Sequence, residues 1–240
     1  LPKVLHPIGG KPMLSHVVDA AATLAPSQTI IVHSEQNKEA LQASIFGQNL
    51  IWALQETPKG TAHAVMAALP FVPEDHEVVI LCGDVPLISK ETLHNLMQKE
   101  PSKPLALLTA YVKEPRGLGR IIRNDQGDVV AIREDKDATE KERLIHEINT
   151  GIYRVEARAL KQWLSQLDNN NAQEEYYLTD IIQLAAANHQ VTTLFPCLPE
   201  EIMGVNDRAQ LIACERFYQE RLANEWLKEG VTIIDPKRFD

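Results

Sequence analysis

Apolar runs rich in β-branched residues alternate along the chain with stretches whose apolar positions recur at helical spacing. Strands are predicted over residues 29–32, 49–55, 77–81, 104–112 and 148–155. Helices are predicted over residues 13–24, 37–45, 60–69, 157–167, 176–188 and 207–228. This alternation is the βαβ signature of an α/β protein. We therefore expect a Rossmann-like fold with a mixed, mostly parallel sheet flanked by helices.

Local signals refine this arrangement. Residues 119–123 and 129–133 flank Asn-Asp-Gln-Gly, which predicts a hairpin and an antiparallel part of the sheet. Ser89 and Asp207 are good helix N-caps. The run 77–81 is continuously apolar after Glu77, which predicts a strand buried on both faces. It ends at Cys-Gly-Asp, and open α/β sheets bind ligands at the carboxyl ends of their strands.

Composition narrows the function classes. A chain of 240 residues with 44% hydrophobic residues can form one large domain with a substantial core. The net charge of −9 and the lack of a Lys/Arg-rich run argue against nucleic-acid binding. Three cysteines without a C-x-x-C pattern predict neither a disulfide framework nor a zinc site, and favour a reducing cytoplasm. No apolar run reaches the roughly 20 residues that span a bilayer, so we expect no membrane association.

Several stretches, in this order, resemble one family. They are Leu-Pro-Lys-Val-Leu-His at 1–6, Gly-Thr-Ala-His-Ala at 60–64, Gly-Asp-Val-Pro-Leu at 83–87, Glu-Asp-Lys-Asp-Ala at 134–138, Glu-Ile-Asn-Thr-Gly at 147–151, Tyr-Tyr-Leu-Thr-Asp at 176–180 and Gly-Val-Asn-Asp-Arg at 204–208. Each is weak alone, but their order and spacing are specific. Together they resemble the N-terminal uridylyltransferase domain of bacterial bifunctional UDP-N-acetylglucosamine pyrophosphorylase/glucosamine-1-phosphate N-acetyltransferases.

The resemblance implies an activity and a domain plan. The expected reaction joins UTP to GlcNAc-1-phosphate with Mg²⁺, giving UDP-GlcNAc for peptidoglycan and lipopolysaccharide synthesis, and pyrophosphate. Residues 1–227 would form this domain, and residues 228–240 would begin the linker to a left-handed β-helix acetyltransferase domain. The family's glycine-rich phosphate loop is expected just before Leu1 and is not in this sequence. We expect acetyl transfer and homotrimer formation only in a full-length protein that carries the β-helix.

The resemblance also implies a metal and phosphate site. Asp84 and Asn206 are the implied Mg²⁺ ligands, and a carboxylate with an amide oxygen suits that ion. Lys3 is implied to contact the phosphates, where an ammonium stabilises growing charge. From the residues alone, Asp84 could instead be a turn residue, Asn206 a helix cap and Lys3 a surface lysine. We expect Asp84 and Asn206 to meet at one ion.

The remaining implied contacts divide between the base and the sugar. Gln55 offers a donor and an acceptor to uracil, Gly60 lets the backbone approach the base, and Thr61 begins a helix. Alternatively, these are an exposed strand end and an ordinary helix start. Cys82 and Gly83 would line the site beside Asp84. The implied sugar contacts are Gly119, Glu134, Asn149 and Thr179, each of which could otherwise be a surface or turn residue.

Other functions remain open at this stage. Asp-Lys-Asp at 135–137 matches the D-x-D of glycosyltransferases, although Asp84 is the better-placed ligand. His63 and His146 have no Ser or Cys partner at a spacing typical of a hydrolytic triad. The nearest alternatives are a transferase for another sugar-1-phosphate or base, and a regulatory domain that binds nucleotide sugars without turnover.

Overall fold

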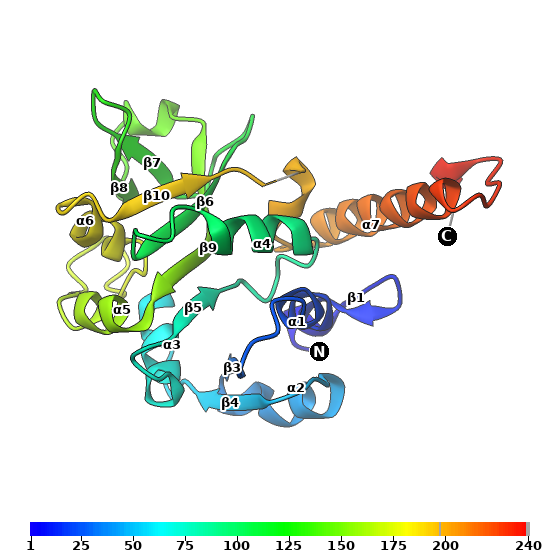
Figure 1. Cartoon of the computed structure of the whole chain (residues 1–240), viewed down its shortest axis with the longest axis horizontal. Helices are drawn as coiled ribbons and strands as arrows, with labels where there is room; N and C mark the ends of the chain where they lie inside the picture. Colours follow the sequence, from blue (N-terminus) through cyan, green and yellow to red (C-terminus); the bar gives the residue numbers. More distant parts are fainter. Residues whose placement is uncertain (197, 239–240) are drawn as a thin grey trace.

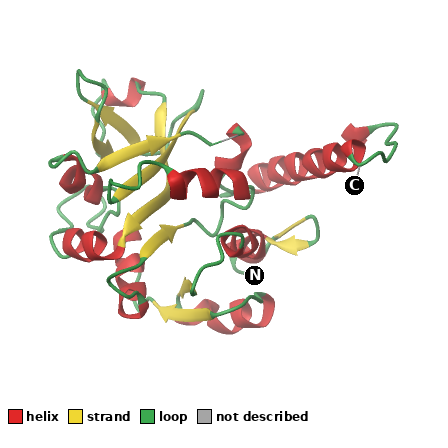
Figure 2. Cartoon of the chain, viewed as in Figure 1, coloured by secondary structure: helices red, strands yellow, loops and turns green. Residues whose placement is uncertain are grey.

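A computed structural model describes residues 1–196 and 198–238 (Figure 1). Strands form the centre and helices lie around them (Figure 2). The strands are β1 (Pro7–Ile8), β2 (Lys11–Pro12), β3 (Thr29–His33), β4 (Leu50–Leu54), β5 (Glu77–Ile80), β6 (Leu105–Tyr111), β7 (Arg120–Arg123), β8 (Val129–Arg133), β9 (Glu147–Glu156) and β10 (Val191–Leu194). The helices are α1 (Met13–Ala22), α2 (Lys38–Ser44), α3 (Thr61–Ala68), α4 (Lys90–Gln98), α5 (Ala157–Leu164), α6 (Asp180–Ala186) and α7 (Arg208–Lys228), with a short 3-10 helix η1 (Lys3–Leu5) before β1.

The main sheet has six strands in the order β10-β6-β9-β7-β8, and β5 pairs with β9 beside this path. The expected α/β fold with a mixed sheet is confirmed, but the expectation of mostly parallel pairing is wrong. Only β10 and β6 pair in parallel in this sheet. The strands β5, β6 and β7 do run in one direction, yet each of them pairs with β9, which runs against them. Antiparallel ladders therefore predominate.

One edge of β9 is shared by two strands. β5 occupies its carboxyl-terminal part, where Ile80 pairs with Tyr153, and β7 joins at its start, where Arg120 pairs with Ile148. Between these two pairs, β9 has no ladder partner on this edge among the described residues. β5 pairs with no other described strand, and its residues are only partly buried. The prediction that the run 77–81 is buried on both faces is therefore wrong.

Two smaller sheets complete the strands. β3 and β4 pair in parallel, and β1 and β2 form a short antiparallel hairpin. Neither β1–β2 nor β10 was predicted; β1 and β2 have only two residues each, too short for any period, whereas β10 carries the β-branched run Val-Thr-Thr-Leu. The hairpin at 119–133 forms as predicted, with β7 and β8 antiparallel and Gly127 N–H donating to the Asn124 carbonyl (2.9 Å).

The helices follow the sequence signals, with one exception. Ser89 caps α4 by accepting from Thr92 N–H at 3.1 Å, and Asp207 caps α7 by accepting from Gln210 N–H at 2.8 Å. α6 begins at Asp180 and not at 176, because the backbone of Tyr176 is bonded to residues 59–62 and residues 178–179 form a turn. Tyr176 N–H donates to the Lys59 carbonyl (2.8 Å) and Ala62 N–H to the Tyr176 carbonyl (3.0 Å). Among the described helices, none is long and apolar enough to cross a membrane.

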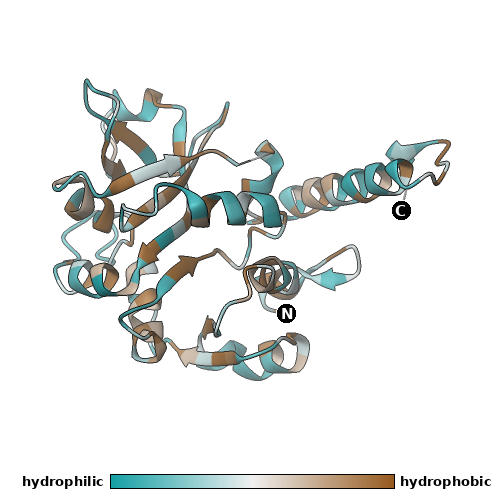
Figure 3. Cartoon of the chain, in the orientation of Figure 1, coloured by the Kyte–Doolittle hydropathy of each residue, from teal (hydrophilic) through white to brown (hydrophobic). Residues whose placement is uncertain are grey.

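Apolar side chains pack on both faces of the main sheet. One cluster joins β6 and β9 to α5 and α6, and a second joins β6 to α4. The outward face of α4 is hydrophilic (Figure 3). α7 packs on the body around Cys214, Ile8 and Val205, and Arg221 donates to the Leu87 carbonyl at 3.1 Å. Its carboxyl-terminal end then projects away from the body (Figure 1). It ends at Lys228, and the domain boundary at 227 remains a prediction.

A fully buried arginine holds the turn between α4 and β6 against β9. The Arg154 guanidinium pairs with Glu77 of β5 at 2.8 Å. It also donates to the carbonyl oxygens of Lys99 (2.9 Å) and Lys103 (3.1 Å). A buried charge needs such partners to offset its desolvation. The side chain therefore ties three segments of the sheet together.

We predict that Arg154→Leu lowers the free energy of unfolding by about 2–4 kcal/mol, because it leaves the carbonyl groups of the turn without their donor and removes the ion pair with Glu77. Urea unfolding followed by circular dichroism measures this change. The same replacement at the exposed Arg158 should cost no more than ~0.5 kcal/mol. Equal losses at both positions would contradict the role given to Arg154.

Candidate active site

Three distant parts of the chain meet at one lysine ammonium. Lys3 lies in η1, Asp84 follows β5, and Asn206 precedes α7. Lys3 Nζ lies 2.5 Å from Asp84 Oδ2 and 2.9 Å from Asn206 Oδ1. The backbone strengthens this junction, since Val205 N–H donates to the Asp84 carbonyl at 3.0 Å. The structure therefore brings Asp84 and Asn206 together at the carboxyl end of β5, and the ion that they are predicted to share stays a prediction.

The local structure explains why these side chains point to a common centre. Asp207, and not Asn206, caps α7, so the amide of Asn206 is free to face Lys3. Gly83 gives the turn room, because a Cβ there would lie 3.2 Å from Leu14 Cδ1 and 3.5 Å from Val4 Cγ1. Asp84 is thus more than a turn residue, and Lys3 more than a solvated surface group.

The chemistry of this donor set fits a small divalent cation. A carboxylate oxygen and an amide oxygen already share one positive charge, that of Lys3. Within residues 1–196 and 198–238, no group of three or more His, Cys, Asp or Glu side chains could hold a metal. Mg²⁺ commonly takes one or two protein oxygens and completes its octahedron with phosphates and water. Asp84 and Asn206 suit that pattern.

The predicted base-binding residues form a loop docked on the segment before α6. Gly60 has φ +104°, and a Cβ there would lie 2.4 Å from the Tyr176 carbonyl oxygen. Thr61 Oγ1 accepts from Leu178 N–H at 3.0 Å. Glycine is thus required for loop packing, in addition to any contact with a base. The Gln55 amide nitrogen faces the Gly60 carbonyl (3.4 Å) and His63 Nδ1 (3.0 Å), which leaves its oxygen unengaged by the described residues.

The predicted sugar contacts also lie together. Thr179 donates to Glu134 Oε1 at 2.9 Å, and a Cβ on Gly119 would lie 3.5 Å from both Glu134 carboxylate oxygens. Asn149 is next to Gly119, since its N–H donates to the Gly119 carbonyl at 2.8 Å. Burial raises the pKa of Glu134 above its ordinary value, and the Thr179 hydrogen bond only partly offsets this. None of these residues is an isolated surface group.

Cys82 connects the sugar contacts to the Asp84 turn. Its thiol donates to the Gly151 carbonyl at 3.6 Å, and a Cβ on Gly151 would lie 2.7 Å from the sulfur. Burial raises the pKa of Cys82 to about 11. Its side chain is therefore a protonated group that packs against Gly151 of β9.

The residues that would support the alternative chemistries make structural contacts instead. Asp135 pairs with Arg120 at 2.8 Å, and Asp137 accepts from Ala172 N–H at 3.0 Å, so the D-x-D segment holds loops together. His146 Nδ1 bonds to the Val112 carbonyl (2.9 Å) and His63 Nδ1 faces the Gln55 amide (3.0 Å), so the described bonds of these rings engage no hydroxyl or thiol. These contacts favour neither a glycosyltransferase metal site nor a hydrolytic triad.

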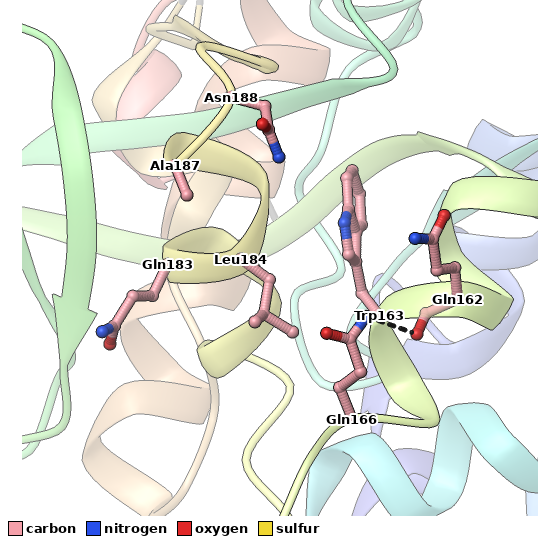
Figure 4. A pocket seen from close by; sticks show the side chains of 7 residues that line it. All are labelled: Gln162, Trp163, Gln166, Gln183, Leu184, Ala187 and Asn188. Carbon is pink, nitrogen blue, oxygen red and sulfur yellow. Dashed lines mark hydrogen bonds between the residues drawn. The ribbon is translucent and has the colours of Figure 1, made fainter.

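A cavity of about 360 Å³ lies elsewhere, between α5 and α6 (Figure 4). Amide side chains and Trp163 line it, and the Gln166 amide is engaged by the Gln162 carbonyl at 3.0 Å. Trp163 is only 5% exposed, so its ring belongs to the core and offers no stacking surface. None of the predicted site residues borders this cavity.

An α/β fold that gathers a carboxylate, an amide oxygen and a lysine at the carboxyl end of a strand has the parts of a phosphate-handling transferase. Residues 1–197 match the nucleotidyl transferase family, and the chain belongs to it. The chain is 47% identical over its whole length to the bifunctional protein GlmU of Alkalilimnicola ehrlichii, and 48% identical to that of Alcanivorax borkumensis. It covers 51% and 53% of these proteins, so it spans about half the length of the curated relatives it matches.

We predict that Cys82 resists alkylation in the folded protein. With a pKa of about 11 it carries little thiolate below that pH, so at pH 7.5 iodoacetamide should label it more than roughly a hundredfold slower than a free cysteine. Peptide mass spectrometry over time measures the rate, and labelling in urea supplies the unfolded control. Fast labelling of the folded protein would show that Cys82 is exposed or activated.

Proposed function

We propose that this chain is an N-acetylglucosamine-1-phosphate uridylyltransferase, which converts UTP and GlcNAc-1-phosphate to UDP-GlcNAc and pyrophosphate. One observation carries the proposal. A continuous series of contacts links the Gln55–Thr61 loop, Thr179 and Glu134, Gly119 and Asn149, the Asp84 turn, and finally Lys3. A nucleotide and a sugar phosphate lying along this series would each find suitable polar groups.

The phosphates belong at the Lys3 end. The Lys3 side chain is 45% exposed, so its ammonium can turn from Asp84 to an incoming phosphate oxygen. Asp84 and Asn206 would hold Mg²⁺, which when bound screens the phosphate charges and orients the triphosphate. The chain carries a net charge of −9. A polyanionic substrate would therefore bind where positive charge is available, at the Lys3 ammonium and a bound Mg²⁺.

The base belongs at the Gln55 end. Because its amide nitrogen is engaged by Gly60 and His63, Gln55 offers an acceptor oxygen. The uracil N3–H can donate to that oxygen, whereas cytosine presents an unprotonated N3 at the same place. Two acceptors facing each other leave both without a donor, which is costly once water is excluded. This arrangement favours UTP over CTP.

The chemical step needs no protein nucleophile. An oxygen of the sugar phosphate attacks the α-phosphorus of UTP, a new P–O bond forms, and the bond to the β-phosphate breaks to release pyrophosphate. The protein contributes positioning and charge stabilisation. Glu134 accepts from sugar hydroxyls, Asn149 holds the sugar from the β9 side, and Lys3 meets the charge that grows on the phosphates.

The wider implications of the resemblance are part of this proposal. UDP-GlcNAc made here would supply peptidoglycan and lipopolysaccharide synthesis in the bacterial cytoplasm. Acetyl transfer and a homotrimer belong to a full-length protein with a β-helix domain. Both relatives are named as bifunctional proteins, which agrees with a second activity in those proteins.

Pyrophosphate release tests the proposal directly. The protein at its full natural length should release pyrophosphate from UTP and GlcNAc-1-phosphate, and much less from CTP or glucose-1-phosphate. Faster turnover of another sugar phosphate or base would indicate a different nucleotidyltransferase. Tight UDP-GlcNAc binding without pyrophosphate release would indicate a regulatory domain.

The metal ligands are tested by a double-mutant cycle. Asp84→Ala and Asn206→Ala should each lower kcat by about 10²–10³-fold, because each removes a ligand that the same ion needs. The double variant should be little worse than Asp84→Ala alone, since residues that act as a unit are not additive. Asp125→Ala, in the exposed hairpin loop, is the control. Fully additive losses in the double variant would show that Asp84 and Asn206 do not act through the same ion.

A further inference from the structure

β9 contains a bulge at the point where the candidate site lies. Tyr153 pairs with Leu107 of β6 and Asn149 with Thr109, so the register shifts between these two pairs. The residues between them form the bulge, and Gly151 at its centre has φ +76°. Thr150 Oγ1 closes it by donating to the Leu108 carbonyl at 2.7 Å. Bulges re-aim side chains, and this one turns Asn149 and Tyr153 toward each other.

The bulge fixes which way the Asn149 amide faces. Gly151 N–H donates to Asn149 Oδ1 at 2.9 Å, and the Tyr153 hydroxyl lies 3.0 Å from the same oxygen. A backbone N–H can only donate, so the atom facing it must be the amide oxygen. With two donors, that oxygen has no lone pair left for a substrate. The amide nitrogen is the group of Asn149 that remains to meet a ligand.

Tyr153 is suited to a fixed role as a donor. It is 1% exposed, and burial raises its pKa far above the ordinary value, so the hydroxyl stays protonated at any working pH. Asn149 Oδ1 is the hydrogen-bond acceptor for this hydroxyl among the described residues. Sequence patterns gave no signal for Tyr153, which reads there as an ordinary apolar position of a strand.

We infer that Tyr153 is a positioning residue that makes Asn149 a donor-only contact for the sugar. This inference rests on the proposed function and deepens it. A donor-only contact requires an acceptor on the substrate, and the carbonyl oxygen of an acetamido group provides one. The ammonium of an unacetylated amino sugar cannot accept a hydrogen bond and would face two N–H donors. The Tyr153–Asn149 pair therefore selects N-acetylated sugar phosphate over the free amine.

Tyr153→Phe removes one hydroxyl and keeps the ring. In the protein at its full natural length, we expect the KM for GlcNAc-1-phosphate to rise roughly three- to tenfold, the range expected for one neutral hydrogen bond. The KM for UTP should stay within about twofold, since Gln55 and Lys3 are untouched. Preference in kcat/KM for GlcNAc-1-phosphate over glucosamine-1-phosphate should fall. Tyr218→Phe is the matched control, because Tyr218 of α7 makes its described contacts through its ring.

Three results would overturn the inference: Tyr153→Phe behaving like Tyr218→Phe, a parallel rise in both KM values, or an unchanged sugar preference. A parallel rise would mean that the hydroxyl only supports the fold. Failure of the proposed function looks different, because the unmodified protein would then release no pyrophosphate from UTP and GlcNAc-1-phosphate.

If Tyr153→Phe does not fold, Asn149→Asp provides a second test of the donor role of Asn149. The carboxylate keeps one oxygen for Gly151 N–H and the Tyr153 hydroxyl, but it replaces the outward donor by an acceptor. We expect GlcNAc-1-phosphate to lose far more in kcat/KM than glucosamine-1-phosphate, so that the preference narrows or reverses. Equal losses for the two sugar phosphates would show that Asn149 does not select the acetamido group by donating a hydrogen bond to it.

Discussion

The antiparallel course of β9 through a set of parallel strands is the constraint on which this structure depends. Because β9 runs against β5, β6 and β7, its amino-terminal half lies beside the carboxyl end of β5. The turn that carries Asp84 and the start of β9 that carries Asn149 therefore share one edge. The site lies beside the part of β9 between Ile148, which pairs with β7, and Tyr153, which pairs with β5. Without a strand in that reversed direction, the two halves of the site would lie at opposite ends of the sheet.

Close backbone contact is the second feature of the site, and glycine makes it possible. A side chain at Gly60 would collide with the backbone of Tyr176, and one at Gly151 would collide with the sulfur of Cys82. These contacts bind each loop of the site to the next one along it. The polar groups of the site are thus held in place by contacts between loops and strands and not by a separate hydrophobic core. It also explains why motifs far apart in sequence need small residues at their centres.

Buried polar groups give the frame its precision. Arg154 satisfies the carbonyl groups of the α4–β6 turn, and Tyr153, the preceding residue on β9, points to the opposite face and holds the Asn149 amide. One strand thus stabilises the fold with one residue and orients the site with its neighbour. The alternation of side chains along a strand makes this division of roles possible.

The sequence by itself determined the α/β class, the helices, seven of the ten described strands, the N-caps Ser89 and Asp207, and the residues that the structure brings together at the candidate site. Hydrophobic periodicity, cap chemistry and the order of motifs are properties of the sequence, so they can be read without a tertiary structure. Only the tertiary structure decided strand pairing, the late start of α6, and the polarity of Asn149. Pairing depends on which strand inserts between which others, and α6 starts late because distant residues 59–62 bond to the backbone of Tyr176 and Leu178. The Asn149 amide is fixed by a bulge that no periodicity encodes, because a bulge is defined only against the partner strand.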